Sequence, residues 1–577
     1  MKPHEMEIVA TPPRFAAWLT RPMLKNKQVY IKVGLAAAMI NLFGLASALF
    51  AMTVYDKVLP NNATASMIGL SIGLLIVIVF DFVLRTLRSY FVDIAGANVD
   101  RDVGATAFDR LLSLRLDARR GSTGALAAIL RELETLRDFF ASVTLSTMID
   151  VPFIILTMIA IGFIGGPLVI VPLIMVPLVL ASAWLTYPAM DRLAADAMKQ
   201  GLSKQAVLVE TIGGIETVKT SGAGPLLTRR WLASIEAHAE QSLLQRLIGS
   251  ISMNVANAAQ TLTYAGIVVV GVYMIVARDL TMGGLIACSM LGTRAVAPLA
   301  QIAMLLSRLT STRMAYRQIN GLMEQPSEKS NPTPLRPAKV DGLIEMREVG
   351  FRYPGAAENA LNGINLTIKP GERVALLGRV GSGKSTMARL ALGLYEPTDG
   401  LVQLDGTDMR QLDLGHTRSM IGTALQESVL LTGSIRENIV LERDGIDDEE
   451  MLRAARLSGA HDFIGRIANG YDMVLSDRGE SLSGGQRQSI ALARAFAGRP
   501  HMMVFDEPTS AMDNESEQAL IERIAPEIDG RTLLLITHRM SLLRLVNRVI
   551  LMRDGKILAD GPRDEILRRL AAPPKAA

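Results

Sequence analysis

The stretch Gly378-Arg379-Val380-Gly381-Ser382-Gly383-Lys384-Ser385-Thr386 decides the fold of the second half of the chain. It matches Gly-x-x-x-x-Gly-Lys-[Ser/Thr] and lies between an apolar run, 374–377, and a helix-like run, 387–394. Glycines let backbone N–H groups curve around a phosphate, and the N-terminus of the next helix adds its positive dipole end. We expect Lys384 to neutralise β- and γ-phosphates and Ser385 to ligate the bridging Mg²⁺. An ordinary strand–turn–helix corner is the alternative for the pattern alone.

Two later apolar strands end in side chains that suit phosphate chemistry. Residues 501–505 lead into Asp506 and Glu507, and 533–536 lead into Thr537 and His538. Two carboxylates at the end of a buried strand are costly unless a cation lies there. We therefore expect Asp506 to hold Mg²⁺, Glu507 to polarise the attacking water and His538 to contact the γ-phosphate. The alternative is a solvated strand end with no ligand.

Composition places the other half of the chain in a membrane. The 577 residues have a mean hydropathy of +0.29, with 49% hydrophobic and 20% charged residues, which is too apolar for a soluble protein of this length. The net charge of +4 gives little reason to expect nucleic acid, so none is predicted as a partner. The single cysteine, Cys288, excludes an intramolecular disulfide framework and is expected to be a buried hydrophobe.

Charge-poor runs of span length predict a membrane domain at 33–313 with six helices. Their approximate bounds are 33–55, 62–82, 144–164, 167–187, 253–276 and 281–306. Gly165-Gly166-Pro167 interrupts a run of forty uncharged residues and predicts a helical hairpin. Nine arginines lie between the second and third spans, whereas the opposite turns offer only Lys57 and Arg278. Both termini are therefore expected on the cytoplasmic side.

The segments around these spans carry further expectations. Residues 1–32 are interpreted as a cytoplasmic or interfacial lead-in with Trp18 as a membrane anchor, a disordered tail being the alternative. The connections 81–142 and 191–246 are expected to be out-and-back helices whose tips, 119–124 and 221–225, dock on the cytosolic domain. Residues 324–341 are a proline-rich linker before the α/β domain, 342–577.

Ionisable residues at membrane depth are costly and suggest function. Asp150 and Arg294 are the strongest cases, and we expect Arg294 to face a wet translocation pathway. Asp81 and Arg85 lie at the edge of a span, four residues apart. For them we favour a simple i,i+4 ion pair.

The segment Leu482-Ser483-Gly484-Gly485-Gln486-Arg487-Gln488 resembles the signature of ABC transporter ATPases. The remaining motifs follow in family order: Tyr353 resembles the adenine-stacking aromatic, Gln426 the Q-loop glutamine, Ser510 to Asp513 the D-loop, and His538 the switch histidine. The resemblance implies a six-helix exporter membrane domain followed by a P-loop ATPase that binds ATP and Mg²⁺, with Gln426 among the Mg²⁺ and γ-phosphate contacts. It also implies a half-transporter that works as a homodimer, because one subunit's signature acts on the ATP of the other.

Within exporters, residues 46–62, 165–168, 216–219 and 294–301 resemble type I secretion permease/ATPases, the branch of RTX toxin and large adhesin exporters. That resemblance implies ATP-driven export of an unfolded polypeptide with a C-terminal signal across the bacterial inner membrane. The implied partners are membrane lipid, a periplasmic membrane-fusion adaptor and an outer-membrane tunnel protein. Many members carry a peptidase-like domain before the spans, and this sequence is not expected to process a leader peptide. An exporter of lipid or drug-like molecules, and an ATP-gated channel or receptor without hydrolysis, are the alternatives.

Overall fold

The chain forms two compact units in the computed structural model, which describes residues 15–117, 123–140, 149–331 and 333–571. The helical unit comprises Met1–Leu112 and Arg120–Gln325, and the α/β unit comprises Ser113–Arg119 and Pro326–Ala577. The predicted fold class, a helical membrane domain followed by an α/β P-loop domain, is confirmed. Residues 119–122 of the first predicted tip and 144–148 of the third predicted span lie outside the described residues.

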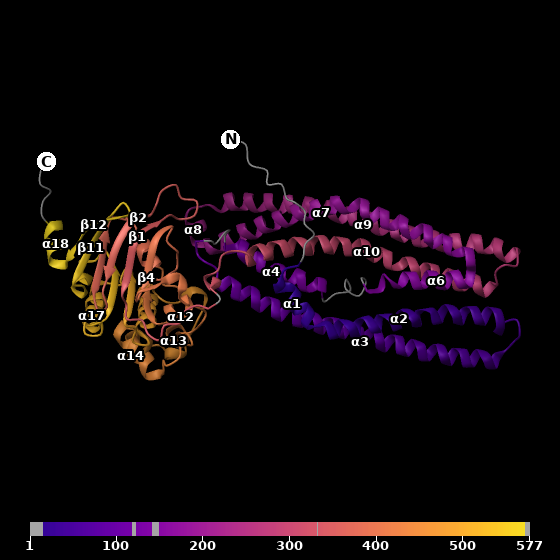
Figure 1. The fold of residues 1–577 in the computed structure, drawn as a ribbon, viewed down its shortest axis with the longest axis horizontal. Helices are drawn as coiled ribbons and strands as arrows, with labels where there is room; N and C mark the ends of the chain where they lie inside the picture. The colour runs from indigo at the N-terminus through magenta and orange to yellow at the C-terminus, as the bar shows by residue number, and fades with distance from the viewer. Residues whose placement is uncertain (1–14, 118–122, 141–148, 332, 572–577) are drawn as a thin grey trace. The chain divides into compact units, whose positions relative to one another are not determined.

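Long helices build the first unit (Figure 1). Their bounds are α1 Ala17–Lys25, α2 Lys27–Thr53, α3 Thr64–Leu112, α4 Thr123–Phe140, α6 Phe153–Gly165, α7 Ile170–Gly213, α8 Ile215–Thr220, α9 Gly224–Val276 and α10 Met282–Met323. Five described segments are long and apolar enough to cross a membrane, and one of them, Phe153–Gly213, spans both α6 and α7. The chain turns between these two helices at Gly166, where φ is +50°, as Gly165-Gly166-Pro167 predicted.

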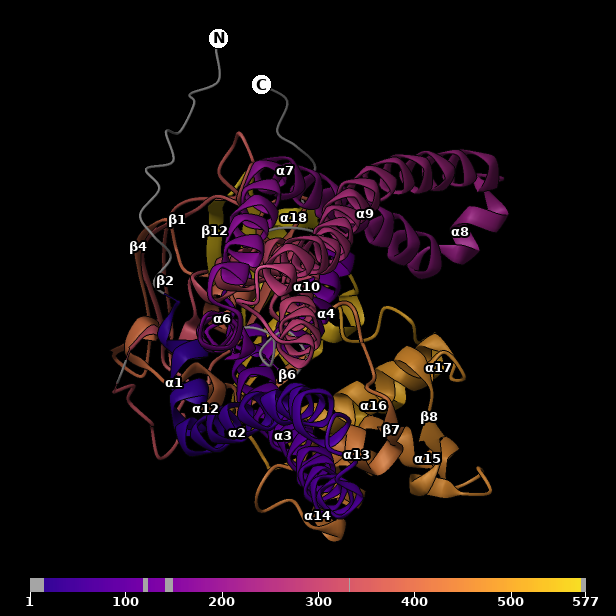
Figure 2. The ribbon, with the colours of Figure 1, turned by 90° about the vertical axis from the view of Figure 1, so that its right-hand side faces the viewer.

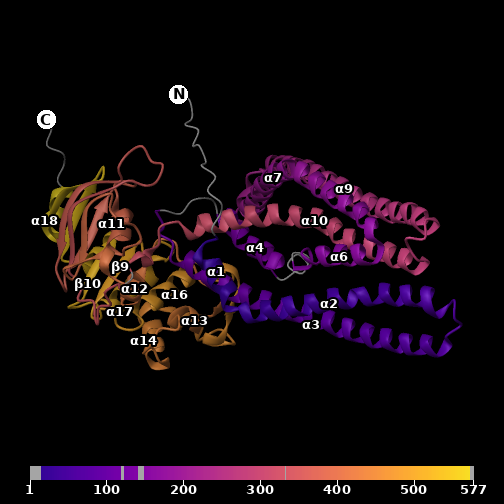
Figure 3. The same cartoon turned by 45° about the vertical axis from the view of Figure 1, so that its right-hand side comes forward.

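The helices form a hairpin and a bundle within this unit. Helix α2 packs along α3, while α7, α9 and α10 pack against one another (Figure 3). The long connections are helical, as expected, because α3, α7 and α9 continue far beyond the length of a membrane span. Helix α8 and a short turn join α7 to α9 at the second predicted tip (Figure 2).

Two ion pairs form between charged side chains of the helical unit. Arg88 pairs with Asp150 at 3.0 Å, and the Asn41 amide donates to the same carboxylate at 3.1 Å. The expected pair of Asp81 and Arg85 is present at 2.6 Å. These contacts show how the structure accommodates carboxylates at the ends of the apolar segments.

Two residues of the helical unit that were singled out in the sequence, Trp18 and Cys288, can be placed in the structure. The ring of Trp18 stacks on Tyr316 of α10, with centroids 5.6 Å apart, and its indole N–H donates to Asn320. Trp18 therefore contacts α10, and its role as a membrane anchor stays a prediction. Cys288 is fully buried, as expected.

The second unit contains a six-stranded sheet in the order β12-β11-β3-β10-β9-β6, parallel except for β12. Its strands are β3 Arg373–Gly378, β6 Ile421–Ala424, β9 Met502–Asp506, β10 Thr532–Ile536, β11 Arg548–Arg553 and β12 Lys556–Pro562. An antiparallel sheet, β2-β1-β4-β5, adds β1 Ile344–Phe351, β2 Leu361–Ile368, β4 Asp399–Leu404 and β5 Thr407–Asp408. A two-stranded sheet joins β7 Gly433–Ser434 to β8 Val474–Leu475.

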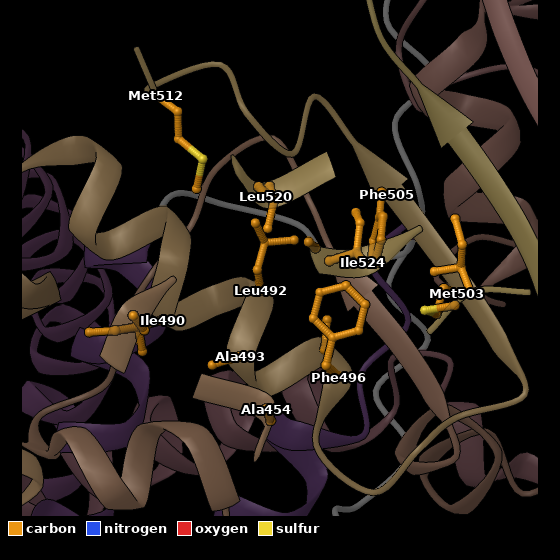
Figure 4. Close-up of a cluster of buried hydrophobic side chains, with 14 of the residues drawn as sticks. Ala454, Ile490, Leu492, Ala493, Phe496, Met503, Phe505, Met512, Leu520 and Ile524 are labelled. Atoms are coloured by element: carbon orange, nitrogen blue, oxygen red, sulfur yellow. The ribbon is translucent and has the colours of Figure 1, made fainter. Parts of the chain in front are cut away.

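Helices cover these sheets and carry the motifs. They are α11 Lys384–Ala391, α12 Leu414–Ser419, α13 Ile435–Val440, α14 Asp448–Ser458, α15 Ala460–Ile464, α16 Gly484–Phe496, α17 Asn514–Ile524 and α18 Arg563–Ala571. Buried apolar side chains of α16 pack against those of β9 and α17 (Figure 4). Phe496 at the end of α16 meets Phe505 of β9 edge to face, with centroids 5.7 Å apart. Helix α16 is therefore held firmly beside the carboxylate strand.

Candidate nucleotide site

The phosphate loop takes its shape from glycines at positions where a side chain does not fit. Gly378 ends β3 with φ +151°, and a Cβ there would lie 2.3 Å from the Met552 carbonyl. Gly383 precedes α11 with φ +99°, and a Cβ would lie 2.6 Å from Leu361. Both positions require glycine on conformational and steric grounds. Arg379, Val380 and Gly381 are exposed at the turn of the loop, whereas Ser382 and Thr386 are buried.

Lys384 is held inside this loop by neutral acceptors. Its ammonium group donates to the carbonyls of Gly378 and Arg379 at 2.7 and 2.8 Å. Burial lowers the pKa of Lys384, and the nearby carboxylates of Glu507 and Asp506 act in the opposite direction. Because charge-assisted bonds to phosphate are stronger than bonds to neutral carbonyls, this lysine can exchange its present partners for a phosphate.

The sheet brings the separate motifs to one edge. Strand β10 lies between β3 and β9, with Ile536 opposite Leu376 on one side and Asp506 on the other. The carboxyl ends of these parallel strands therefore place the phosphate loop, Asp506, Glu507 and His538 together. Strand β6 pairs with β9 in the same direction, and Gln426 follows it by two residues with an exposed side chain.

Asp506 has the properties of a metal ligand that lacks a protein partner for one oxygen. The residue is only 3% exposed, and its Oδ1 finds no hydrogen-bond partner among the described residues. Burial raises the pKa of Asp506, and the Ser385 hydroxyl partly offsets that rise. A carboxylate and a hydroxyl are oxygen ligands suited to Mg²⁺, which proteins usually bind together with substrate phosphates. No cluster of three His, Cys, Asp or Glu side chains forms a metal cage in the described part of the chain.

Glu507 adopts a backbone conformation that is unusual for a residue with a side chain. Its φ is +53°, and such strain persists where surrounding bonds enforce it. The Glu507 N–H donates to the Ile536 carbonyl at 2.9 Å. The carboxylate Oε1 lies 3.4 Å from Nε2 of His538 without forming a hydrogen bond. Burial raises the pKa of Glu507, and the nearby His538 lowers it, so the carboxylate and the imidazole form a polar pair at the sheet edge.

Tyr353 lies two residues beyond β1 and is fixed by its hydroxyl group. The hydroxyl forms a hydrogen bond with Thr386 at 3.0 Å and accepts one from Arg389 at 3.2 Å. Phe351 and Tyr395 pack edge to face on its ring. The aromatic side chain is thus tied to the first turn of α11 and remains partly exposed. Sequence reasoning missed Arg389 and Tyr395, which belong to no local motif.

The signature forms the start of α16. Ser483 and Gln486 cap this helix reciprocally: the Ser483 hydroxyl accepts from the Gln486 N–H, and the Gln486 side chain accepts from the Ser483 N–H. Leu482 is buried and anchors the turn. Gly484 and Gly485 open onto a groove of about 730 Å³ that Asp513 also lines. No described residue lining that groove belongs to the phosphate loop.

The D-loop connects β9 to α17. Asp513 caps α17 by accepting the Ser516 N–H at 2.8 Å. Arg539, the residue after His538, donates to the Met512 carbonyl at 3.0 Å and to Glu517 at 2.6 Å. Glu517 is 3% exposed. Sequence reasoning missed this buried carboxylate and its arginine, because only the fold brings them together.

Comparisons with known proteins follow the same division of the chain. Residues 361–510 match the model of the ABC transporter family, and residues 30–296 match that of the ABC transporter transmembrane region. The leukotoxin translocation ATP-binding protein LktB of Mannheimia haemolytica is 32% identical over 554 residues, which cover 96% of this chain and 78% of the relative. The chain belongs to the ABC transporter family. An ABC transporter of this kind couples ATP hydrolysis to transport across a membrane.

Two further comparisons extend this result. The exotoxin translocation ATP-binding protein PaxB of Pasteurella aerogenes is 32% identical over 553 residues, 95% of this transporter and 77% of the relative. A bacterial Atm1-family ABC exporter solved with ATP bound superposes with a TM-score of 0.83 at 24% identity. That superposition covers 97% of this transporter and 99% of the solved chain. The solved structure therefore supports the exporter fold.

Arg294 occupies the helical unit of the transporter. Its guanidinium donates to the Gly44 carbonyl of α2 at 2.5 Å. A Cβ on Gly44 would lie 2.4 Å from the guanidinium carbon, so the glycine makes room for the arginine. The structure thus shows a link between α10 and α2, and exposure of Arg294 to a translocation pathway stays a prediction.

Proposed function

We propose that two copies of this chain form the permease/ATPase of a type I secretion system, which exports an unfolded RTX-type protein or adhesin with a C-terminal signal. The observation that carries the proposal is the identity of 32% with translocation proteins named for leukotoxin, across 96% of the chain, and for exotoxin, across 95% of the chain. The transporter would lie in the bacterial inner membrane. The arginine-rich connections favour a cytoplasmic ATPase unit and cytoplasmic termini.

The ATP site would use residues that follow four adjacent strands, β3, β10, β9 and β6, together with Tyr353 after β1. The backbone of Gly378 to Thr386 and the Lys384 ammonium would hold the phosphates, and Tyr353 would stack on the adenine. Ser385, Asp506 and Gln426 would hold Mg²⁺, which neutralises phosphate charge when bound. Glu507 would orient and polarise the attacking water, while His538 would contact the γ-phosphate. The unpartnered, buried Asp506 oxygen supports the metal assignment.

A homodimer would supply the missing half of each site. The signature, Leu482 to Gln486, opens onto a groove that the described residues of the phosphate loop do not line. A helix N-terminus with glycines favours phosphate binding, so a second subunit's ATP fits there. We infer two equivalent composite sites, each with the phosphate loop of one subunit and the signature and D-loop residues Ser510 and Asp513 of the other.

Transport would follow from a difference in dimer affinity between nucleotide states. ATP binding would close the two ATPase units, and hydrolysis would release them, with Gln426 sensing the γ-phosphate. A ligand can shift such an equilibrium only by its differential affinity for the two states. The adaptor and the outer-membrane tunnel would carry the emerging polypeptide onward.

The class of cargo is tested by deleting the chromosomal gene for this transporter and comparing the secreted proteins by mass spectrometry. The deletion strain is then complemented either with the wild-type gene or with the Glu507→Gln variant. We expect a secreted polypeptide to disappear and only the wild-type gene to restore it. The purified transporter in proteoliposomes should then hydrolyse ATP faster with the C-terminal segment of that polypeptide than with a scrambled segment. Stimulation by lipids or drug-like molecules alone would instead support the small-molecule exporter. Absence of ATP turnover in lipid would support the non-hydrolysing channel or receptor.

Partners are tested by crosslinking in intact cells followed by purification of the transporter. We expect a periplasmic adaptor and an outer-membrane protein in the crosslinked fraction. A fraction that contains only the transporter would contradict the secretion-system proposal.

A further inference from the structure

Gln488 lies on α16, at the end of the segment that resembles the signature and two residues after Gln486, and is only 3% exposed. Its side-chain amide makes three hydrogen bonds to one region. The Nε2 group donates to the Glu507 carbonyl at 2.9 Å and to the Ser510 hydroxyl at 3.2 Å. The Oε1 atom accepts the Ala511 N–H at 2.9 Å. One buried amide therefore joins the signature helix to the catalytic glutamate and to the D-loop.

The bond to Glu507 falls at the point where the backbone is strained. Glu507 has φ +53°, a region that non-glycine residues occupy at a cost of about 1–3 kcal/mol. The Glu507 N–H is fixed by Ile536 of β10, and its carbonyl is fixed by Gln488. These two bonds hold the peptide groups on either side of the Glu507 α-carbon. Losing either one would let the carboxylate rotate away from its position beside His538.

Helix α16 can carry such a link because it is rigid and well packed. Its apolar face is buried against β9, with Phe496 on Phe505. Its N-terminus presents Gly484 and Gly485 to the groove at the other end of the same thirteen-residue helix. Gln488 lies on the second turn, so a shift of the signature moves its amide by a similar distance.

We propose that Gln488 is a positioning residue for ATP hydrolysis. Its hydrogen bonds hold Glu507 and the D-loop in a fixed position relative to the signature helix of the same subunit. This inference rests on the proposed homodimer, in which that signature contacts the partner's ATP. Closure of the signature on the second nucleotide then aligns the glutamate at the first. The two ATP sites of the dimer are thereby coupled through one side chain in each subunit.

The first experiment compares Gln488→Met and Gln488→Glu with wild type in proteoliposomes. Met fills the same volume but makes none of the three bonds, whereas Glu retains the acceptor for Ala511 and loses the donor to Glu507. We expect both to lower kcat by about 10- to 100-fold, the range for a small displacement of a catalytic group. The KM for ATP should stay within about twofold, and the Hill coefficient should fall to 1. Leu492→Met, a volume-conserving change on the buried apolar face of α16, is the control and should retain wild-type kcat.

Mixed dimers separate a positioning role from general damage to α16. Two tags allow purification of dimers in which one subunit carries Glu507→Gln, so that only the other subunit supplies a glutamate. Gln488→Met placed in the subunit with the intact Glu507 should abolish the remaining turnover. The same change placed in the Glu507→Gln subunit should leave that turnover within about twofold, because its signature still closes on the active site. Equal losses in both arrangements would overturn the inference, since damage to the signature would act on the partner's site.

The outcomes also distinguish this inference from the proposed function. A wild-type protein that is monomeric in lipid and does not hydrolyse ATP would contradict the homodimeric ATPase itself. A dimeric, active wild type whose Gln488→Met variant keeps its kcat and Hill coefficient would overturn only the role of Gln488. Thermal unfolding of each variant, compared with Leu492→Met, shows that the protein tested is folded.

Discussion

Two clusters of charged side chains, one in each unit, are arranged in opposite ways. In the helical unit, the Arg88 guanidinium meets the Asp150 carboxylate directly, and Asn41 completes the cluster. In the ATPase unit, Lys384 donates to neutral loop carbonyls, although Asp506 and Glu507 are close enough to influence its pKa. Both carboxylates keep a buried oxygen without a hydrogen-bond partner among the described residues. The cluster around Asp150 is satisfied within the protein, whereas the carboxylates beside the phosphate loop keep oxygens available for a ligand.

Glu507→Gln should break the function of the ATPase unit most severely. The amide keeps the shape of the side chain but cannot act as a general base, so kcat for ATP should fall by about 10²–10⁴-fold. The variant should still bind MgATP and accumulate as an ATP-bound dimer. Turnover and size-exclusion chromatography with radiolabelled ATP measure both effects. An undiminished ATPase rate would remove the catalytic assignment of Glu507.

Asp506→Asn should separate function from stability. The substitution removes a desolvated charge, so the ATPase unit should unfold at a higher temperature when Mg²⁺ and nucleotide are absent. The apparent Mg²⁺ affinity, measured from the metal dependence of ATP turnover, should fall at least about tenfold. Thermal unfolding in EDTA provides the stability measurement. A variant that is less stable and retains its Mg²⁺ dependence would contradict the metal assignment.

Asp150→Asn should have the opposite effect on stability in the helical unit. It leaves Arg88 without its carboxylate, and we expect a loss of about 2 kcal/mol, less than for a fully buried pair. Arg88→Gln combined with Asp150→Asn should recover part of this loss, as unfolding of each variant would show. The more exposed pair of Asp81 and Arg85 is the control, where Asp81→Asn should cost below about 1 kcal/mol. Equal losses at the two sites would contradict the comparison.

Glu132→Gln should have the smallest effect on stability. It tests a second partly buried carboxylate of the helical unit, for comparison with Asp150. Glu132 lies on α4, outside the predicted spans, beside a cavity of about 380 Å³. Burial raises the pKa of Glu132, and the Thr135 hydroxyl only partly opposes this. The charged form is thus penalised at neutral pH, and the variant should be more stable there by less than about 1 kcal/mol. That advantage should vanish as the pH falls through the raised pKa, which unfolding measured across pH checks; a constant difference would contradict it.

The contiguous motifs were predictable because their chemistry is local. The phosphate loop requires glycines at fixed spacing before a lysine, and the structure has Gly378 and Gly383 at positive φ as that geometry demands. The hairpin at Gly165-Gly166-Pro167 follows from backbone preferences in the same way. The contacts of Trp18 were not predictable, because an amphipathic helix packs equally well on lipid or on another helix. Its contact with Tyr316 lies almost 300 residues away in sequence.

The sequence by itself determined that this protein is an ABC exporter with one copy of each ATPase motif. Short-range rules for turns, helix caps and apolar periodicity are written in neighbouring residues. Only the tertiary structure decided that Lys384, Asp506 and His538 share one sheet edge, because strand order is a property of the whole domain. The same holds for Gln488 on Glu507 and Arg88 on Asp150, since a buried hydrogen bond depends on which elements pack together.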